Sequence, residues 1–484
     1  MSEMLSAPSP FSLLLFGASG HLARFKIYPA LYTLTLKKRL PKDYAVVGFS
    51  RTAMNDASFR TCVAESVRTD MMGAANESVL KEFLTHCWYH TGEYTEEGDY
   101  HALRHRLTSV EKGWRKGVRL AYYSVPPTIF SPISENLCKS GFAHDRKELR
   151  CILEKPVGHN FDDFRAISSS LKHCVHEKHI YFLDHYLGKE AARNVYYLRL
   201  ANPILEEIFA HTLLQYVEIS APESAGIEGR AGYFDHTGTL RDIFQSHLLM
   251  VASLLTMRLT ETPVSFARSR LEALRRFYVP PARSLKDVII QGQYAAGTIG
   301  KEQVKGYRNE EGVPPHSRTN TFVALRLRSR MPRWEGIPFL FRAGKRLAGK
   351  ETRLTLSFQE PWSVGKGAGP NRLDIILQGE AGMRFHLQTK LGGTEPAFRP
   401  LILSDPLVCE GDCLPEHGLL LLEAIHGKKQ WFLSPEEVDA AWRLIDPLQA
   451  YLDDPATALH SYRAGTDGPK AAEEWIAREG IKWL

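Results

Sequence analysis

The first part of this sequence predicts an α/β domain with a parallel sheet, and two observations support that prediction. Short apolar runs of strand length alternate with longer helical segments throughout residues 11–184, an order typical of strand–helix–strand units. Several of these runs end directly in glycine-rich, basic or polar residues. Because ligands of parallel α/β sheets bind beyond the carboxyl ends of the strands, these strand ends are the candidate functional positions.

The first expected strand is Ser12–Phe16, an apolar run that leads into the turn Gly17-Ala18-Ser19-Gly20. A helical pattern follows from Leu22 to Leu40. A glycine turn between a strand and a helix lets a phosphate approach the bare backbone N–H groups of the helix N-terminus. The turn lacks the full GxGxxG spacing, so an ordinary strand–helix turn is the alternative interpretation.

The second expected strand, Tyr44–Phe49, ends beside Arg51. In nucleotide-binding units an acid at this place favours a free ribose 2′-hydroxyl, whereas a basic group favours a 2′-phosphate. No acid adjoins Arg51, so a dinucleotide site here would favour NADP. A surface arginine in a loop is the alternative.

The same alternation is expected up to residue 184. Residues 55–115 are predicted to be mainly helical. Further strands are expected at 120–125, 150–154 and 180–183, with helices over 132–139 and 162–177. Lys155 follows one of these strands and precedes Pro156, where a cis peptide bond could fix the direction of the lysine.

The strand Ile180–Leu183 stops at four polar or ionisable side chains: Asp184, His185, Tyr186 and Lys189. Placing four such groups at the edge of a core costs free energy unless they bind a ligand. A solvated polar turn is the alternative for this stretch taken alone. We place the boundary between two domains here.

The second domain, residues 185–484, has a different pattern. From about residue 285, strand-like segments without long intervening helices predict a largely antiparallel sheet. These segments are 319–327, 339–342, 353–358, 373–378 and 385–388, and helices are expected near 240–255, 434–452 and 470–478. His247 lies on the apolar face of the helix that begins near Leu240, where a histidine is more often a core residue than a functional one.

Composition narrows the possible classes of function. The net charge of +6 is spread over 484 residues without a block of five like charges, which suits a phosphorylated substrate and gives no indication of nucleic-acid binding. No apolar run reaches 18 residues, so no membrane span or membrane partner is expected. The first ten residues lack the pattern of a signal peptide.

The seven cysteines are scattered and form no CxxC motif. Cys409 and Cys413 have no second pair of ligands nearby, so we expect no structural zinc. Reduced thiols in a cytoplasmic protein are the expectation.

Seven motifs together resemble the glucose-6-phosphate dehydrogenase family, in the family's order and over nearly the whole chain. They are GASGHLARFK (17–26), EKPVG (154–158), DHYLGKE (184–190), EGRAGYFD (228–235), RDIFQSH (241–247), RWEGIPFLFRAGKRL (333–347) and YRAGTDGPKAAEEW (462–475). The resemblance implies an NADP-binding α/β Rossmann domain over 1–184. It also implies an α+β domain over 185–484, whose large, mainly antiparallel sheet carries the contacts of a homodimer or homotetramer. The implied reaction oxidises glucose 6-phosphate at C1 with NADP⁺, the first step of the oxidative pentose phosphate pathway.

The same resemblance implies a role for each matching residue. His247 matches the general base, and Asp184 matches the carboxylate that pairs with it. The implied substrate-binding residues are His185, Tyr186, Lys189, Glu223, Asp242, Lys345, Lys350 and Lys155. The implied cofactor-binding residues are Gly17, Ser19, Gly20, Lys26, Arg51 and again Lys155.

Elementary chemistry agrees with these roles. Hydride leaves C1 readily only as the proton of the C1 hydroxyl is removed, which requires a base within hydrogen-bond reach. A histidine suits this task near neutral pH, and a carboxylate on its other nitrogen fixes the tautomer. A sugar phosphate needs charge-assisted donors. No metal is expected, because the nicotinamide is the oxidant.

One residue departs from the family pattern, because His21 replaces the aspartate that follows GASG in the family. Two alternatives to the implied reaction stay open. One is an NADP-binding regulator or scaffold without catalytic activity, and the other is a dehydrogenase for a different hexose.

Overall fold

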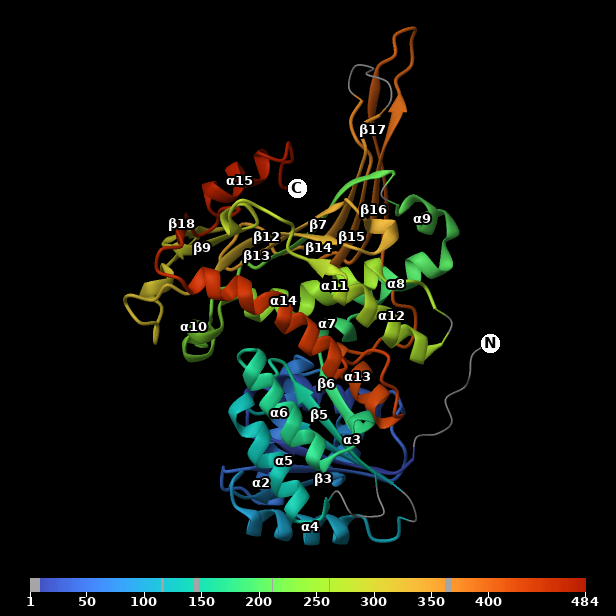
Figure 1. Cartoon of the computed structure of the whole chain (residues 1–484). Coiled ribbons are helices and arrows are strands. Elements are labelled where there is room, and N and C mark those ends of the chain that lie inside the picture. Colours follow the sequence, from blue (N-terminus) through green and yellow to red (C-terminus); the bar gives the residue numbers. More distant parts are fainter. Residues whose placement is uncertain (1–8, 115–116, 143–147, 211, 261, 362–367) are drawn as a thin grey trace. The chain divides into compact units, whose positions relative to one another are not determined.

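The computed structural model describes residues 9–114, 117–142, 148–210, 212–260, 262–361 and 368–484, and the chain forms two compact units (Figure 1). The first unit extends to Lys189 and also takes in Cys409–Asp439, and the second contains Glu190–Val408 and Ala440–Leu484. We expected residues 185–484 to form a single second domain. In the structure, residues 409–439 belong to the first unit instead. Residues 1–8, which bear on the expected absence of a signal peptide, lie outside the described residues.

The first unit is built on a six-stranded sheet in which every neighbouring pair is parallel. Its strands are β1 (Phe11–Phe16), β2 (Tyr44–Ser50), β3 (Cys87–Thr91), β4 (Val118–Tyr123), β5 (Glu148–Glu154) and β6 (Ile180–Leu183). Their order, β3-β2-β1-β4-β5-β6, is that of the Rossmann dinucleotide-binding fold and confirms the predicted class of the first domain. Every residue of β1 and β2 is buried, which explains why these central parallel strands are mostly apolar instead of alternating between apolar and polar residues.

Helices flank this sheet (Figure 1). They are η1 (Ala23–Ile27, a π-helix), α1 (Tyr28–Leu36), α2 (Asp56–Asp70), α3 (Glu77–Thr85), α4 (Glu97–Val110), α5 (Phe130–Lys139), α6 (Phe161–Cys174), α7 (His185–Gly188) and α13 (Glu416–Ile425), with short 3-10 turns η2 (Pro127–Ile129) and η4 (Glu177–His179). The segment 55–115 is mainly helical, as predicted, but it also contains β3, a strand of five residues directly after α3 that was not predicted. No glycine or proline separates the two elements, so the sequence carries no turn signal there.

The segment 409–439 is held to the first unit by hydrogen bonds to strands of its sheet. The Arg150 guanidinium on β5 donates to the carbonyl oxygens of Ala424 and Ile425 at 2.6 and 2.9 Å. The Leu433 N–H donates to the Phe182 carbonyl on β6 at 2.9 Å. These bonds join residues far apart in sequence, so local sequence patterns do not predict them.

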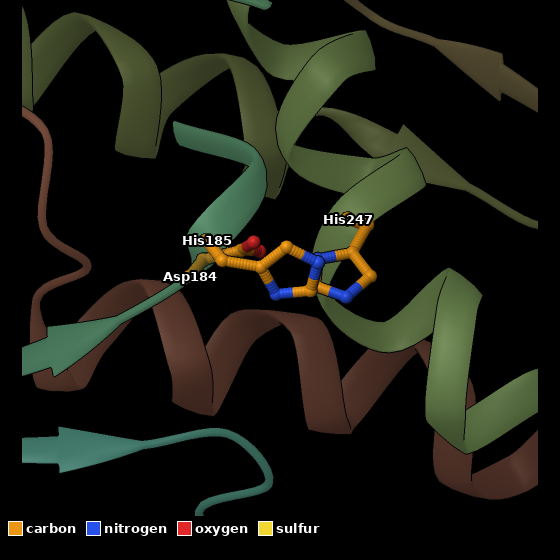
Figure 2. A group of neighbouring side chains, drawn as sticks. All are labelled: Asp184, His185 and His247. Atoms are coloured by element: carbon orange, nitrogen blue, oxygen red, sulfur yellow. The ribbon is translucent and has the colours of Figure 1, made fainter. Parts of the chain in front are cut away.

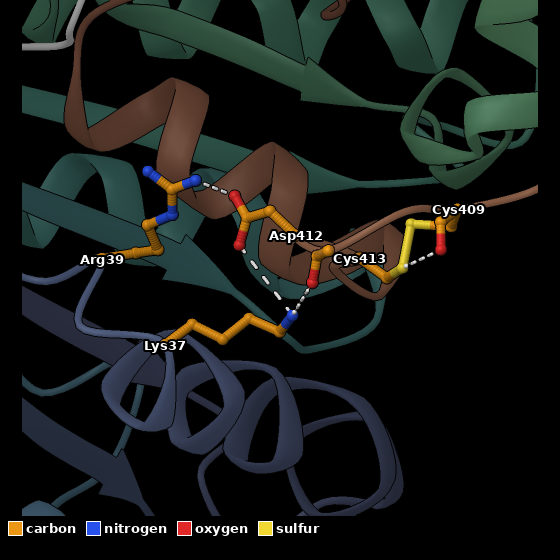
Figure 3. The surroundings of a disulfide bond; sticks show 6 residues. Lys37, Arg39, Cys409, Asp412 and Cys413 are labelled. Carbon is orange, nitrogen blue, oxygen red and sulfur yellow. Dashed lines mark hydrogen bonds and ion pairs between the residues drawn. A yellow bond between two sulfur atoms is a disulfide. The ribbon is translucent and has the colours of Figure 1, made fainter.

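Cys409 and Cys413 form a disulfide at the start of this segment (Figure 3), and the other five cysteines are free. The expectation that all thiols are reduced is therefore wrong for this pair. A separation of four residues and the turn at Gly411 (φ 91°) bring the two side chains together. The spacing of the two cysteines in the sequence did not by itself predict this disulfide.

The second unit contains a mixed, mostly antiparallel sheet, which confirms the predicted α+β class. Its strands are β7 (Leu214–Pro222), β8 (Phe277–Tyr278), β9 (Ile289–Ala295), β12 (Phe322–Ser329), β13 (Pro338–Gly344), β14 (Thr352–Phe358), β15 (Arg372–Gln378), β16 (Gly382–Lys390), β17 (Phe398–Pro406) and β18 (His460–Arg463). The order is β17-β16-β15-β14-β7-β13-β12-β9-β18, with β8 paired to β12. The pairs β7–β13 and β9–β18 are parallel.

A buried cluster that includes Tyr294, Tyr307, Phe322, Tyr462 and Trp475 joins strands of this sheet to the helix Lys470–Ala477. The helices are α8 (Glu190–Ala201), α9 (Pro203–Ile208), α10 (Ala231–Thr239), η5 (Leu240–Leu248, a π-helix), α11 (Leu249–Thr256), α12 (Pro263–Arg275), α14 (Pro435–Asp453, which starts within the first unit) and α15 (Lys470–Ala477). The remaining elements are the hairpin β10 (Gly297–Ile299) with β11 (Glu302–Val304) and the turns η6 (Leu285–Asp287), η7 (Tyr307–Asn309) and η8 (Pro332–Trp334). No helix within the described ranges is both long and apolar enough to cross a membrane.

Candidate active site

The glycine turn after β1 has the geometry expected of a phosphate-binding turn. Gly17 has φ +85°, and a Cβ there would lie 2.1 Å from the carbonyl oxygen of Ser124. The Gly17 N–H donates to the Phe49 carbonyl on β2 at 3.0 Å, and the Gly20 N–H donates back to Gly17 at 2.9 Å. A side chain at Gly17 is therefore excluded both by its conformation and by its surroundings. The turn lies between β1 and β4, where the strand order reverses and ligands of this fold bind.

The ends of β1 and β2 are joined through hydroxyl groups. Ser19 Oγ lies 3.0 Å from Ser50 Oγ and accepts a hydrogen bond from Thr52 at 2.9 Å. Arg51, between these residues, is exposed, and its guanidinium carbon lies 5.9 Å from the ring centre of Tyr94. Burial raises the pKa of Tyr94 to about 12. The aromatic contact holds the arginine at the end of β2, where a ribose 2′-phosphate would lie in this fold.

Lys26 and His21 follow the glycine turn. Lys26 lies on η1, and its Nζ is 3.4 Å from the Glu416 carboxylate at the start of α13. His21 is exposed, and its ring centre lies 4.3 Å from that of Phe25. The first turn of η1 has no acidic residue and no side-chain cap. His21 therefore packs along the helix rather than capping it.

Lys155 follows β5, and the Lys155–Pro156 peptide bond is cis, as the sequence suggested. The preceding Glu154 is buried and accepts a hydrogen bond from the Tyr122 hydroxyl. Its Oε1 also lies 3.4 Å from Nε2 of His417. Burial and the neighbouring Glu154 carboxylate hold the pKa of Tyr122 well above its usual range.

The polar stretch after β6 forms the four-residue helix α7. The Asp184 carboxylate caps this helix, because Oδ1 accepts the Tyr186 N–H at 2.9 Å. Lys189 directly follows the helix, and its ammonium lies 4.1 Å from the ring centre of Tyr186. The structure thus brings three of the predicted residues together within the first unit. Figure 2 shows Asp184 and His185 where β6 meets α7.

His417 is a residue of this region that the sequence analysis missed. Its ring is buried and nearly parallel to that of His185, with an interplanar angle of 9° and ring centres 6.4 Å apart. Close contact between α13 and α7 explains this position, because a Cβ at Gly188 would lie 2.7 Å from the carbonyl oxygen of Glu416. His417 lies in the C-terminal third of the chain, and the sequence carries no local signal for this contact.

Apart from Lys155, the predicted sugar-binding residues lie on the second unit. Lys345 forms an ion pair with Glu223, because the parallel strands β13 and β7 end side by side, with Gly344 opposite Pro222. Lys345 is almost fully buried, and its Nζ lies 5.2 Å from the ring centre of Phe234. Lys350 is exposed in the loop between β13 and β14.

Asp242 and His247 both lie on η5. In an α-helix, residues five positions apart point about 140° away from each other. A π-helix closes i→i+5 hydrogen bonds, so the same residues lie about one turn apart. Asp242 Oδ1 accepts a hydrogen bond from the Tyr233 hydroxyl at 3.3 Å, and burial beside this carboxylate raises the pKa of Tyr233. Figure 2 shows His247 on its helix.

Two family models match the chain. "Glucose-6-phosphate dehydrogenase, NAD binding domain" matches residues 14–194, and "Glucose-6-phosphate dehydrogenase, C-terminal domain" matches residues 196–484. The chain is 35% identical over 482 residues to glucose-6-phosphate 1-dehydrogenase of Aggregatibacter actinomycetemcomitans, covering 97% of this chain and 96% of the relative. It is 34% identical to the chloroplastic enzyme of Spinacia oleracea, covering 99% of this chain and 85% of the relative.

Solved structures agree with these matches. A glucose-6-phosphate dehydrogenase in complex with its substrate glucose-6-phosphate superposes with a TM-score of 0.90 at 28% identity, covering 99% of this chain and 100% of the other. Glucose-6-phosphate 1-dehydrogenase from Mycobacterium avium superposes with a TM-score of 0.84 at 27% identity, covering 99% of each chain.

Proposed function

Because the chain belongs to the glucose-6-phosphate dehydrogenase family, we propose that it oxidises D-glucose 6-phosphate at C1 to 6-phospho-D-glucono-1,5-lactone with NADP⁺. The observation that carries this proposal is the match of two family models over residues 14–194 and 196–484, together with relatives that bear this enzyme's name at 34–35% identity. The reaction is the first step of the oxidative pentose phosphate pathway.

The residues after β1 and β2 fit the cofactor. A Cβ at Gly17 would collide with the Ser124 carbonyl, so only glycine fits this turn, and a pyrophosphate is proposed to lie at the start of the helix that follows. Arg51 supplies the positive charge for a 2′-phosphate. Gly17, Ser19, Gly20, Lys26, Arg51 and Lys155 would hold NADP⁺, which supplies the hydride acceptor when bound. Lys26 would share its charge between the cofactor and Glu416.

The substrate phosphate is proposed to bind at α7. His185, Tyr186 and Lys189 offer an imidazole, a hydroxyl and an ammonium within one turn of chain, which suits a dianionic phosphate ester. The sugar is proposed to contact Glu223, Asp242, Lys345, Lys350 and Lys155. The ion pair between Lys345 and Glu223 holds one positive and one negative group ready for sugar hydroxyls.

His247 is proposed to remove the proton of the C1 hydroxyl as the hydride leaves. Asp184 is proposed to accept a hydrogen bond from the other ring nitrogen, which fixes the tautomer and stabilises the imidazolium. The cap that Asp184 Oδ1 forms on α7 restricts the rotation of this carboxylate. Asp184 belongs to the first unit and His247 to the second.

The direct experiment follows NADPH formation by its near-ultraviolet absorbance. The protein is mixed with glucose 6-phosphate or glucose, and with NADP⁺ or NAD⁺. Turnover with glucose 6-phosphate and NADP⁺ is expected. A preference for unphosphorylated glucose would instead support a dehydrogenase for another hexose, and NADP⁺ binding without turnover would support a regulator or scaffold.

A homodimer or homotetramer is part of the proposal. The strand β17 ends the large sheet, and its Ile402 and Leu403 are 56% and 53% exposed. An exposed edge strand with apolar side chains is suited to a second copy of the chain. Light scattering coupled to size exclusion is expected to give at least twice the monomer mass, and a monomer at assay concentration would contradict this part.

A cytoplasmic location also belongs to the proposal. Five free cysteines suit a reducing compartment, whereas the Cys409–Cys413 disulfide does not support it. Fractionation of cells that produce the protein would test the location, and recovery outside the cytoplasmic fraction would refute it.

A further inference from the structure

A cavity of about 300 Å³ opens in the second unit at the edge of the large sheet. It is bounded by β9, the turn η7 and the last strand, β18. None of the residues proposed to bind substrate or cofactor lines it. The volume falls in the range of pockets that bind small molecules.

Arg308 is the arginine in the lining of this cavity, and two hydrogen bonds fix its position. Its Nε donates to Gln293 Oε1 at 3.0 Å and to the Ser317 carbonyl at 2.9 Å. Within the part of the chain that the structure describes, both bonds found for this guanidinium use Nε. The two terminal amino groups remain for a ligand, and they form the planar fork that binds phosphate through two hydrogen bonds.

Gln293 fixes Arg308 because its own orientation is determined. It is 8% exposed, and its amide nitrogen donates to the carbonyls of Ser317 and Thr319 at 3.1 and 3.0 Å. The amide oxygen must then face Arg308. A charged group positioned by a buried partner in this way loses little freedom when it binds a ligand.

The remaining lining favours an anion. It contains no aspartate or glutamate, and it adds the Asn309 amide, the His460 imidazole and the Ser461 hydroxyl as donors. The nearby Glu310 carboxylate accepts the Tyr294 hydroxyl at 3.1 Å and lies 3.4 Å from the Arg346 guanidinium, so its charge is compensated within the protein.

The cavity is larger than a phosphate ion alone requires. The exposed Ala295 and Ala296 and the half-buried Leu459 give its lining an apolar part. We propose that this cavity binds a small organic phosphate ester, with the phosphate on Arg308, Asn309 and His460 and the organic part against Ala295, Ala296 and Leu459. The site is separate from the one proposed for catalysis.

Calorimetric titration with phenyl phosphate tests the proposal. The full-length protein is first saturated with NADPH and glucose 6-phosphate, which together fill the proposed active site without turnover. We expect phenyl phosphate to bind, and Arg308→Gln to weaken this binding at least tenfold. The control is Arg318→Gln, an exposed arginine on a neighbouring loop that does not line the cavity. No binding to the wild-type protein, or equal binding to the Arg308→Gln variant, would overturn the site.

A second variant keeps the test decisive if Arg308→Gln fails to fold. Ser461 is exposed at the rim, so Ser461→Asp adds a negative charge without burying it. It is expected to abolish phenyl phosphate binding, and unchanged binding would count against the site. Inorganic phosphate is the second probe, and binding as tight as that of phenyl phosphate would overturn the organic part of the ligand. Because these readouts measure binding and not turnover, they do not depend on the proposed reaction.

Discussion

At the scale of single residues, two ion pairs of the first unit differ in how far their charges are removed from water. Arg119 and Glu111 are 4% and 3% exposed and are joined by bonds of 2.8 and 3.1 Å. Arg68 and Glu77 are joined in the same two-bond geometry, but they are 50% and 54% exposed. If one partner is removed, water can solvate the remaining charge at the exposed pair but not at the buried pair.

Glu111→Gln is therefore expected to destabilise the protein strongly. The change removes a buried carboxylate that makes two bonds to the Arg119 guanidinium, and breaking a buried ion pair typically costs about 3–5 kcal/mol. Urea unfolding followed by circular dichroism measures the effect. The matched control Glu77→Gln should barely move the unfolding midpoint, and equal shifts for the two variants would show that burial is not the deciding factor.

His247→Asn is the corresponding test for the proposed reaction. Asparagine keeps a polar side chain of similar reach but cannot act as a base, so the turnover number should fall roughly 10²- to 10⁴-fold. His236→Asn is the control, because His236 is exposed on α10. If the His247→Asn variant turns over at the wild-type rate, the histidine is not the base.

The residues at strand ends could be predicted because each lies beside a local signal. Gly17 follows an apolar run, and Lys155 and Asp184 end two others. His417 could not be predicted, because its contact with His185 depends on how α13 packs against α7. The partners of charged groups, such as Glu416 for Lys26, were missed for the same reason.

At the scale of elements, the loop closed by Cys409 and Cys413 docks on the end of α1. Asp412, inside the loop, forms an ion pair with Arg39 and lies 3.9 Å from Lys37, which also donates to the Gly411 carbonyl at 3.3 Å (Figure 3). The disulfide restricts the chain that carries Asp412. It therefore supports the attachment of the segment before α13.

Thiol titration of the denatured protein is expected to find five free thiols before reduction and seven after it. Closing a loop of five residues removes chain entropy worth about 2 kcal/mol, so reduction should lower the free energy of unfolding by about that amount. The double variant Cys409→Ser with Cys413→Ser should match the reduced protein. Seven thiols before reduction would mean that the disulfide does not form in solution.

Strands and helices with a clear period could be predicted, and several others could not. No glycine or proline marks the start of the strand β3. The π-helical geometry of η5 could not be predicted either, because sequence periodicity assumes 3.6 residues per helical turn. The second case changes the relation between Asp242 and His247 along the helix.

At the scale of the whole molecule, many tyrosines and thiols are buried as neutral groups. Burial raises the pKa of Cys151 and of Tyr181 to about 12. It also holds the pKa values of Tyr28 and Tyr123 well above their usual range. In the unfolded chain these groups ionise near their ordinary pKa values, about 8.5 for cysteine and about 10 for tyrosine.

Stability is therefore expected to fall as the pH rises above about 9. Between the unfolded and folded pKa values the unfolded chain has lost a proton that the folded chain keeps, so each such group removes about 1.4 kcal/mol per pH unit. Below the unfolded pKa both states are protonated, and the group has no effect. Urea titrations from about pH 8 to pH 11 measure this slope. A stability that stays constant or rises over this interval would contradict the assigned pKa directions.

The order of the two folded units could be predicted from the change of pattern near residue 184. The membership of residues 409–439 could not, because it depends on bonds such as that from Leu433 to Phe182. No property of the segment alone distinguishes a helix that covers its own sheet from one that returns to an earlier unit.

This return has a consequence for synthesis on the ribosome. The first unit starts at the N-terminus, but α13 and the segment to Asp439 are made only after the strands of the second unit from β7 to β17, with β18 still to follow. Domains generally fold as they are translated. Until the segment 409–439 has been made, Arg150 and Phe182 of the nascent first unit therefore lack their contacts with it. A ribosome that stalls before residue 409 would leave a Rossmann unit that cannot be completed.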